Sequence, residues 1–279
     1  MLRVPDVIVD VDWLYKNLNH SNLIIFDATI EKVTDNQSTK DNQKYIPKSI
    51  FFDLKNTFSD QESILPNTVI PFSKFELEAQ KLGISNKSCI VVYDNLGIYS
   101  SPRVFWLFRL MGFYNIAVLS GGLTAWIENK LPTVSERKQI EVKGDFTANY
   151  TPEFFSSVTD VRKAISERAI SIIDARGEDR FLGLTNEPRK GLRSGHIPNS
   201  SNIPYTKVLN GGKLTSKESL KKIFKSKEVP QKKAIFSCGS GITASILALA
   251  YEYIGNRNYS VYDGSWTEWG SDIENPIEL

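Results

Sequence analysis

The sequence contains few cysteines and histidines and no long run of apolar residues. Only 2 Cys and 2 His occur in 279 residues. Two cysteines are too few for a disulfide framework and are typical of a reducing compartment, so we expect a cytoplasmic protein. No apolar run approaches the ~20 residues of a membrane span, and the first residues lack a signal-peptide core. We therefore expect no attachment to a membrane.

The chain also lacks a strong excess of charge of either sign. Its 34 basic and 32 acidic side chains give a formal net charge of +2. This balance gives no general reason to expect nucleic acid as a partner. A chain of 279 residues exceeds the usual size of one compact domain, and 41% hydrophobic residues supply a core for two.

The two halves of the chain share four short motifs that occur in the same order. They are an apolar strand with Asp at its end (24–28 and 172–176), an Ile-Pro turn (45–49 and 195–200), a second apolar strand (89–94 and 234–238) and a segment with Gly and Trp (120–126 and 262–269). Such a repeat indicates a duplicated unit. Between the copies, a polar stretch has no apolar periodicity. We predict two similar domains, 1–133 and 150–279, joined by a linker over 134–149.

Each copy alternates short β-branched strands with helical stretches, which is typical of an α/β fold with a mostly parallel sheet and helices on both faces. Ligands of such sheets bind at the carboxyl ends of the strands. Cys238 follows the apolar strand 233–236 and precedes a helical stretch at 246–250. Asp94 occupies the same place in the first copy, so we predict that the first domain is catalytically inactive.

The residues after Cys238 favour a reactive thiolate. Gly239 and Gly241 allow the backbone to curl, so that N–H groups point inward and the next helix adds the positive end of its dipole. Both effects favour the charged form of the sulfur. We therefore predict that Cys238 is a nucleophile rather than a small buried apolar residue. Cys89 lies inside an apolar strand, and we predict no chemistry for it.

The stretch 238–244, which reads Cys-Gly-Ser-Gly-Ile-Thr-Ala, resembles the active loop of the tandem rhodanese-domain sulfurtransferases, in particular their 3-mercaptopyruvate sulfurtransferase branch. Five further motifs match this family in order: Tyr93-Asp94, 101–106, Asp174-Ala175-Arg176, 195–198 and 262–266. The resemblance covers nearly the whole chain and implies two rhodanese-like domains. Thiosulfate-preferring relatives carry Arg and Lys after the cysteine, whereas Gly239 and Ser240 are uncharged.

The resemblance implies a transfer of sulfur from 3-mercaptopyruvate to a Cys238 persulfide with release of pyruvate. It implies no metal and no cofactor, and an acceptor such as thioredoxin, glutathione or cyanide. The implied site residues are Cys238 and Ser240 as catalytic residues, Gly239, Gly241, Ile242 and Thr243 in the loop, and Arg180, Arg189, Tyr99 and Arg103 for substrate binding. Two arginines suit a substrate carboxylate, because guanidinium groups form paired hydrogen bonds with it. We expect a monomer, because the duplication already provides an internal interface.

One motif departs from the family. Many members carry a His in a first-domain segment that resembles Leu-Pro-His-Met-Leu-Pro, where it is proposed to relay protons with the loop Ser. Here residues 65–71 read Leu-Pro-Asn-Thr-Val-Ile-Pro, and the two histidines are His20 and His196, the latter a turn residue by our interpretation. Either Ser240 works through water and the groups of the substrate, or the preferred donor differs.

Three alternatives remain. The donor is thiosulfate in the first, and in the second the chain is a non-catalytic persulfide carrier or interaction module. The third is a phosphatase of the Cys-x5-Arg type, which the sequence disfavours because Ala244 occupies the position of that Arg.

Overall fold

The computed structural model describes residues 1–30, 44–167, 169–227, 229 and 233–279. The chain forms two compact units: Met1–Ser59, Val69–Tyr150 and Gly211–Lys213 make the first, and Asp60–Thr68, Thr151–Asn210 and Leu214–Leu279 make the second. The predicted α/β fold with two similar parts is confirmed. The domain limits 1–133 and 150–279 stay a prediction, because the two compact units are defined by their internal contacts and not by independent folding.

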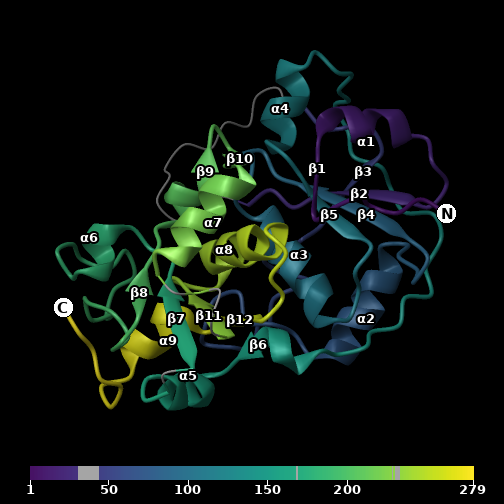
Figure 1. Cartoon of the computed structure of the whole chain (residues 1–279). Coiled ribbons are helices and arrows are strands. Elements are labelled where there is room, and N and C mark those ends of the chain that lie inside the picture. Colours follow the sequence, from purple (N-terminus) through teal and green to yellow (C-terminus); the bar gives the residue numbers. More distant parts are fainter. Residues whose placement is uncertain (31–43, 168, 228, 230–232) are drawn as a thin grey trace. The chain divides into compact units, whose positions relative to one another are not determined.

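The first unit is built on a five-stranded parallel sheet with the strand order β1-β5-β4-β2-β3 (Figure 1). Its strands are β1 (Ile8–Val9), β2 (Leu23–Asp27), β3 (Ser49–Phe51), β4 (Cys89–Tyr93) and β5 (Ile116–Leu119). Its helices are α1 (Val11–Asn17), α2 (Phe72–Lys81), α3 (Ser101–Leu110) and α4 (Gly122–Glu128). All five residues of β4 are buried, as expected for a strand covered on both faces.

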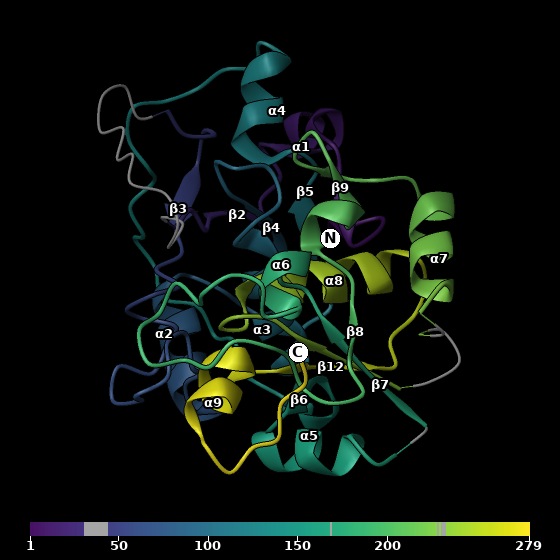
Figure 2. The ribbon, with the colours of Figure 1, turned by 90° about the vertical axis from the view of Figure 1, so that its left-hand side faces the viewer.

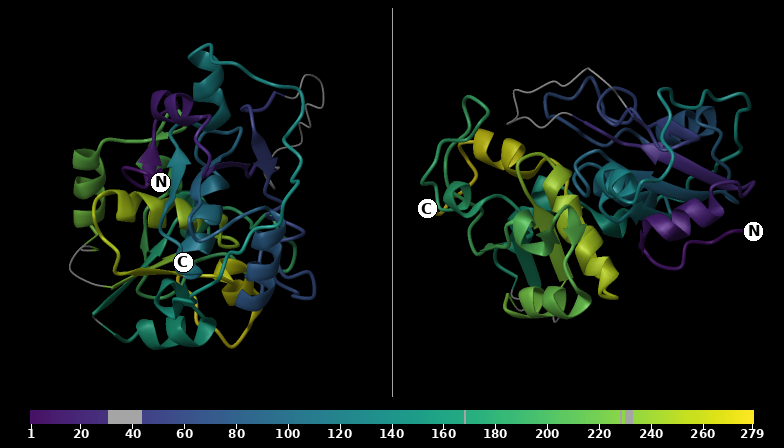
Figure 3. Two further views of the ribbon diagram at one scale, coloured as in Figure 1. Left: turned by 90° about the vertical axis from the view of Figure 1, so that its right-hand side faces the viewer. Right: turned by 90° about the horizontal axis from the view of Figure 1, so that it is seen from above.

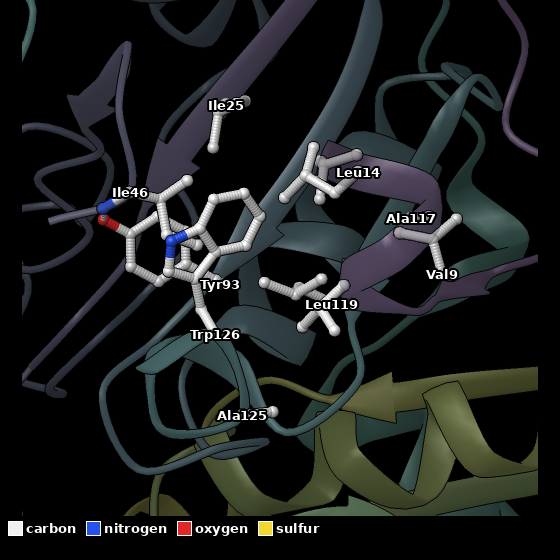
Figure 4. Close-up of a cluster of buried hydrophobic side chains, with 11 residues drawn as sticks. Val9, Leu14, Ile25, Ile46, Tyr93, Ala117, Leu119, Ala125 and Trp126 are labelled. Carbon is white, nitrogen blue, oxygen red and sulfur yellow. Dashed lines mark hydrogen bonds between the residues drawn. The ribbon is translucent and has the colours of Figure 1, made fainter. Parts of the chain in front are cut away.

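Side chains of the first sheet pack in two layers. One layer joins β2, β4 and β5 to α1 and α4 around Trp126 and Leu14 (Figure 4). The other layer is aromatic, and Phe108 of α3 and Phe75 of α2 meet there with ring centroids 5.3 Å apart. Helices therefore cover both faces of the sheet, as the alternation of strands and helices predicts.

The second unit repeats this plan with the parallel order β6-β12-β11-β7-β8 (Figure 2). Its strands are β6 (Phe155–Ser156), β7 (Ile170–Asp174), β8 (Ser201–Asn202), β11 (Lys233–Ser237) and β12 (Tyr259–Tyr262). Its helices are α5 (Val158–Ala164), α6 (Glu178–Phe181), α7 (Lys217–Lys225), α8 (Ile242–Tyr253) and α9 (Ser265–Ser271), with 3-10 turns η1 (Pro152–Phe154) and η2 (Tyr205–Val208). The short strands β9 (Leu209–Asn210) and β10 (Lys213–Leu214) pair with each other.

The second sheet is also covered on both faces. Val161 of α5 and Trp266 of α9 belong to one apolar cluster with Ile172 and Ile235 of the strands. On the other face, Tyr251 of α8 lies against Phe236 of β11 with ring centroids 5.6 Å apart. Helix α8 runs alongside the strands of this sheet (Figure 3). Among the described helices, none combines the length and the apolar character that crossing a lipid bilayer requires.

The polar stretch that follows the first sheet lies on the first unit. The Arg137 Nε donates to Asp27 at 2.8 Å, and the backbone N–H of Phe146 donates to the carbonyl of Ile84. Phe146 is buried among the aromatic rings of this unit. An ion pair, backbone hydrogen bonds and the buried ring of Phe146 thus hold a segment whose sequence shows no apolar period.

Candidate active site

Cys238 lies directly after β11, the middle strand of the second sheet, and shortly before α8 begins at Ile242. The predicted strand, loop and helix around this cysteine are therefore confirmed. Gly241 has a φ of 79°, a left-handed conformation that glycine adopts without a steric cost, and it turns the chain into the helix. This places Cys238 at the carboxyl edge of a parallel sheet, where α/β proteins bind ligands.

The start of α9 holds the backbone of the cysteine loop. The N–H of Cys238 donates to Ser265 Oγ at 3.1 Å, and the N–H of Trp266 donates to the Cys238 carbonyl at 2.9 Å. Thr267 donates to the Gly239 carbonyl from both its N–H, at 2.9 Å, and its Oγ1, at 2.6 Å. No sequence pattern pointed to a role for these two side chains, although Ser265 lies within the motif 262–266 and Thr267 follows it directly.

Both predicted arginines reach the loop. An added side-chain carbon on Gly239 would lie 3.3 Å from Nη2 of Arg180 and 3.7 Å from Nη1 of Arg189. The absence of a side chain at Gly239 therefore leaves room for two guanidinium groups next to the residue that follows Cys238. Because guanidinium groups keep their charge and bind carboxylates in pairs of hydrogen bonds, this corner of the loop suits an anionic substrate.

Arg180 is held by a buried group of charges that the sequence analysis missed. Glu187 accepts from Arg180 through both carboxylate oxygens, with Arg180 Nε at 3.1 Å from Oε1, and it also accepts from Arg176 Nη1 at 2.9 Å. Arg176 in turn binds Asp174, the residue at the end of β7. Burial opposes the charge of Arg176, but Asp174 and Glu187 outweigh it, so the pKa of Arg176 is raised. The signal in the sequence was the Asp174-Ala175-Arg176 motif.

Ser240 has two neighbours on its side chain. Asn67 Nδ2 lies 3.1 Å from Ser240 Oγ and 3.1 Å from the Ser240 carbonyl oxygen. Arg189 Nη2 donates to the same Oγ at 3.3 Å. Asn67 lies in the stretch Asp60–Thr68, which groups with the second unit. The structure thus brings Cys238, Ser240, Arg180 and Arg189 together, as the resemblance implies, and adds Asn67.

The loop after β4 in the first unit holds a carboxylate where the second has a thiol. Asp94 Oδ2 accepts from the N–H groups of Tyr99, Ser100 and Ser101 at 2.9, 3.0 and 2.9 Å, and from Ser101 Oγ at 2.7 Å. Its Oδ1 accepts from the N–H of Leu96 at 3.0 Å. The first loop therefore binds an anion that the chain itself supplies.

Tyr99 and Arg103, predicted to bind substrate, lie in the first unit. Arg103 belongs to α3, is 1% exposed, and has its guanidinium carbon 4.3 Å from the centroid of the Trp106 ring. Tyr99 contacts the Asp94 carboxylate through its backbone N–H. Their contact with a substrate stays a prediction.

Cys89 and His196 both lie in packed surroundings within their own units. Burial raises the pKa of Cys89 in β4 to about 11, so its thiol is neutral at physiological pH. His196 stacks on Phe181 with ring centroids 3.8 Å apart, and its Nδ1 lies 2.8 Å from the Phe181 carbonyl. Within the described ranges, no three His, Cys, Asp or Glu side chains gather as a metal ion would require.

A comparison with family models identifies both halves of the chain. The model of the rhodanese-like domain matches residues 10–129 and again residues 157–272. Among individual proteins, the 3-mercaptopyruvate sulfurtransferase of Escherichia coli is 35% identical over 275 residues, which cover 97% of each chain. The thiosulfate/3-mercaptopyruvate sulfurtransferase 1, mitochondrial, of Arabidopsis thaliana is 35% identical over 99% of this chain and 79% of its own.

Solved structures show the same similarity. SseA from Escherichia coli, whose crystal structure describes the rhodanese fold of 3-mercaptopyruvate sulfotransferases, superimposes with a TM-score of 0.81 at 32% identity over 94% of this chain and 99% of its own. Tum1 of Saccharomyces cerevisiae gives a TM-score of 0.86 at 27% identity, with 98% of both chains covered. The similarity therefore extends over both units.

Proposed function

Since this chain belongs to the rhodanese family, we propose that it is a sulfurtransferase that takes sulfur from 3-mercaptopyruvate onto Cys238. The products of this half-reaction are a Cys238 persulfide and pyruvate. The outer sulfur then passes to a thiol, such as thioredoxin or glutathione, or to cyanide in an assay.

One observation supports this proposal above the others, namely the two guanidinium groups beside Gly239. Cys238, a free thiol at a strand end, directly precedes the glycine that both guanidinium groups approach. A donor with a carboxylate and a reactive sulfur can bind Arg180 and Arg189 at one end and meet Cys238 at the other. Bound in this way, the sulfur atom lies close to the thiolate, which lowers the entropic cost of the attack.

The reaction exchanges one bond for another. The Cys238 thiolate attacks the sulfur of 3-mercaptopyruvate, a sulfur–sulfur bond forms, and the carbon–sulfur bond breaks. The electron pair of the broken bond stays on the organic fragment as the enolate of pyruvate, which takes up one proton. An acceptor thiolate later attacks the outer sulfur and releases Cys238 as a thiolate. Hydrogen-bond donors that are already in place around the developing negative charge accelerate such steps.

Thiosulfate is the second candidate for the donor. The Arabidopsis relative carries both donors in its name, and a sulfonate-like dianion also binds guanidinium groups. The uncharged Gly239 and Ser240 favour mercaptopyruvate, because the loop itself adds no cation. A persulfide carrier without a donor of its own is the remaining alternative, and the arginine pair disfavours it.

The test compares two assays on the purified protein. Pyruvate release from 3-mercaptopyruvate measures the proposed reaction, and thiocyanate formation from thiosulfate and cyanide measures the alternative. We expect the first rate to exceed the second and an intact mass about 32 Da higher after the donor is added. Equal rates would remove the preference for mercaptopyruvate, and background rates with both donors would leave the carrier.

Three further expectations rest on the sequence and belong to the proposal. They are a cytoplasmic location, a monomeric state, and no nucleic acid or membrane as a partner. Both cysteines are free, which agrees with a reducing compartment. Cell fractionation and a sedimentation measurement test the first two expectations directly.

A further inference from the structure

We propose that Ser240 acts toward the substrate as a hydrogen-bond donor that transfers no proton, and that Asn67 is the positioning residue that imposes this role. The inference rests on the proposed function and goes further, because it states how the site works without a histidine beside Ser240.

The orientation of the Asn67 amide follows from a backbone atom. Its Nδ2 lies 3.1 Å from the carbonyl oxygen of Ser240, and a carbonyl oxygen can only accept a hydrogen bond. The NH₂ end of the amide therefore faces the loop. The same nitrogen lies 3.1 Å from Ser240 Oγ, so the hydroxyl oxygen accepts from Asn67 as well.

Arg189 occupies the second acceptor position of the same oxygen. Its Nη2 lies 3.3 Å from Ser240 Oγ, and a guanidinium group has only donors. A hydroxyl group has two lone pairs and one hydrogen, so two donors leave the hydrogen as the one group that Ser240 can offer. In the described part of the chain, no acceptor is paired with that hydrogen. Ser240, which is 8% exposed, therefore offers a donor to the substrate.

The segment that carries Asn67 is held in a defined shape. Asp60 N–H donates to the Thr68 carbonyl at 2.8 Å, and Thr68 Oγ1 donates to the Leu65 carbonyl at 2.9 Å. Asn67 itself has a φ of 61°, in the left-handed region that asparagine tolerates better than most residues. A residue keeps this uncommon backbone conformation only when the surrounding contacts hold it. The Asn67 amide is therefore preorganised toward Ser240.

This arrangement sets the chemistry of Ser240. The hydroxyl is polarised by the charge of Arg189, so it stabilises negative charge that develops on the enolate oxygen or on the sulfur. Ser240 keeps its own proton, and water supplies the proton that ends on the methyl carbon of pyruvate. Because neither Asn67 nor Arg189 titrates near neutral pH, kcat should show no inflection near ~6.5 from a histidine beside Ser240.

Two variants of Asn67 separate this role from a structural one. Asn67→Asp preserves the shape of the side chain but replaces the donor with an acceptor, which competes for the Ser240 hydrogen. Asn67→Ala removes the donor and leaves the hydrogen free. We expect kcat for pyruvate release to fall about 30-fold in Asn67→Asp and only about 3-fold in Asn67→Ala, with smaller changes in KM. A merely structural role predicts the opposite order, because Asp fills the space that Ala leaves empty.

Two controls complete the experiment. Asn129→Asp makes the same chemical change at an amide that also donates to a backbone carbonyl, that of Ala125 at 2.8 Å, and it should leave kcat unchanged. In a Ser240→Ala background, the difference between Asn67→Asp and Asn67→Ala should disappear, because Asn67 acts through Ser240. Asn67→His should add a pH dependence of kcat near ~6.5 that the wild type lacks.

The outcomes distinguish this inference from the proposed function. If the wild type releases no pyruvate, the proposed function is overturned and this inference with it. If the wild type is active but Asn67→Asp retains as much kcat as Asn67→Ala or more, the inference alone is overturned. A wild-type inflection of kcat near ~6.5 that Ser240→Ala removes would also overturn it.

Discussion

The loops after the middle strands of the two sheets both lead into a helix, α3 at Ser101 and α8 at Ile242, but they differ in length and in the residue at their start. In the first unit Asp94 follows β4, and in the second Cys238 follows β11. The N–H groups five, six and seven residues after Asp94 bind its carboxylate. Helix α8 begins at Ile242, only four residues after Cys238, so the N–H groups of its first turn near the sulfur belong to Ile242, Thr243 and Ala244. N–H groups of a first turn lack partners within the helix, and the helix dipole favours an anion there.

The structure shows an anion bound by the first loop, and the comparison predicts that the second loop also favours one. The first copy fills its loop with the carboxylate of Asp94, and its catalytic inactivity stays a prediction. The second copy carries a sulfur atom, which is neutral as a thiol and charged as a thiolate or persulfide. The residue at the start of the loop, Asp94 in one copy and Cys238 in the other, is therefore one difference between a loop held by its own carboxylate and one that carries a thiol.

The largest expected effect comes from giving the second loop the residue of the first. Cys238→Asp should abolish pyruvate release, by at least about 1,000-fold, because the carboxylate cannot carry sulfur. It should still fold, with a Tm above that of Cys238→Ser, because the N–H groups of Ile242, Thr243 and Ala244 at the start of α8 then face an anion. Steady-state assays and thermal unfolding check both points. A Tm below that of Cys238→Ser would contradict the similarity of the loops.

The reverse experiment removes the anion from the first loop. Asp94→Ala leaves the N–H groups of Tyr99, Ser100 and Ser101 without their buried acceptor, so we expect the free energy of unfolding to fall by about 3 kcal/mol. Asp94→Asn, which keeps one acceptor oxygen, should lose less. Urea unfolding of the three proteins measures the difference. A loss below about 1 kcal/mol in Asp94→Ala would show that the carboxylate does not hold the loop.

Cys89, the cysteine of the first unit, should make the stability of the protein depend on pH. The native pKa of Cys89 is raised to about 11, above the unfolded value of 9.0, so the unfolded chain loses this proton first as the pH rises. Between pH 9 and 11 the stability should therefore fall, by about 2 kcal/mol more in the wild type than in Cys89→Ala. Unfolding curves at pH 8 and pH 11 check this. Parallel pH profiles for the two proteins would show that Cys89 does not contribute.

The smallest effect concerns the charges around the Asp at the end of β2 and of β7. Asp27 pairs with Arg137, whereas Asp174 belongs to a network that extends through Glu187 to Arg180. Glu187→Gln removes one strong acceptor, so we expect KM for mercaptopyruvate to rise about tenfold while kcat changes little. Arg137→Gln is the matched control in the first unit and should lower stability alone. A tenfold fall of kcat at constant KM would contradict a role of Glu187 in substrate binding.

Several parts of the site were predictable because they depend on neighbouring residues. The strand 233–236, the glycines after Cys238 and the following helix are local features, and the structure has β11, a left-handed Gly241 and α8 there. Arg180 and Arg189 lie beside the loop in the structure, but they were nominated from the resemblance to a family, and their binding of substrate stays a prediction. Periodicity alone does not indicate which surface arginine turns toward a given loop.

Other parts have no local signal. The Asn67 amide meets Ser240 across 173 residues of sequence, and Arg189 meets it across 51. Phe146 anchors a polar segment because the aromatic layer of the first unit has space for its ring. Glu187 is one of many acidic residues in the sequence, and only burial between Arg176 and Arg180 distinguishes it.

The sequence by itself determined the duplicated α/β plan, the position of Cys238 at a strand end and Asp94 at the matching position of the first copy. These features follow from the order and type of residues that are adjacent in the chain. Only the tertiary structure decided that Ser240 accepts from two donors and that Glu187 orients Arg180. Such contacts depend on where distant segments of the chain meet in space, and neither hydrophobic periodicity nor local turn preference specifies that meeting.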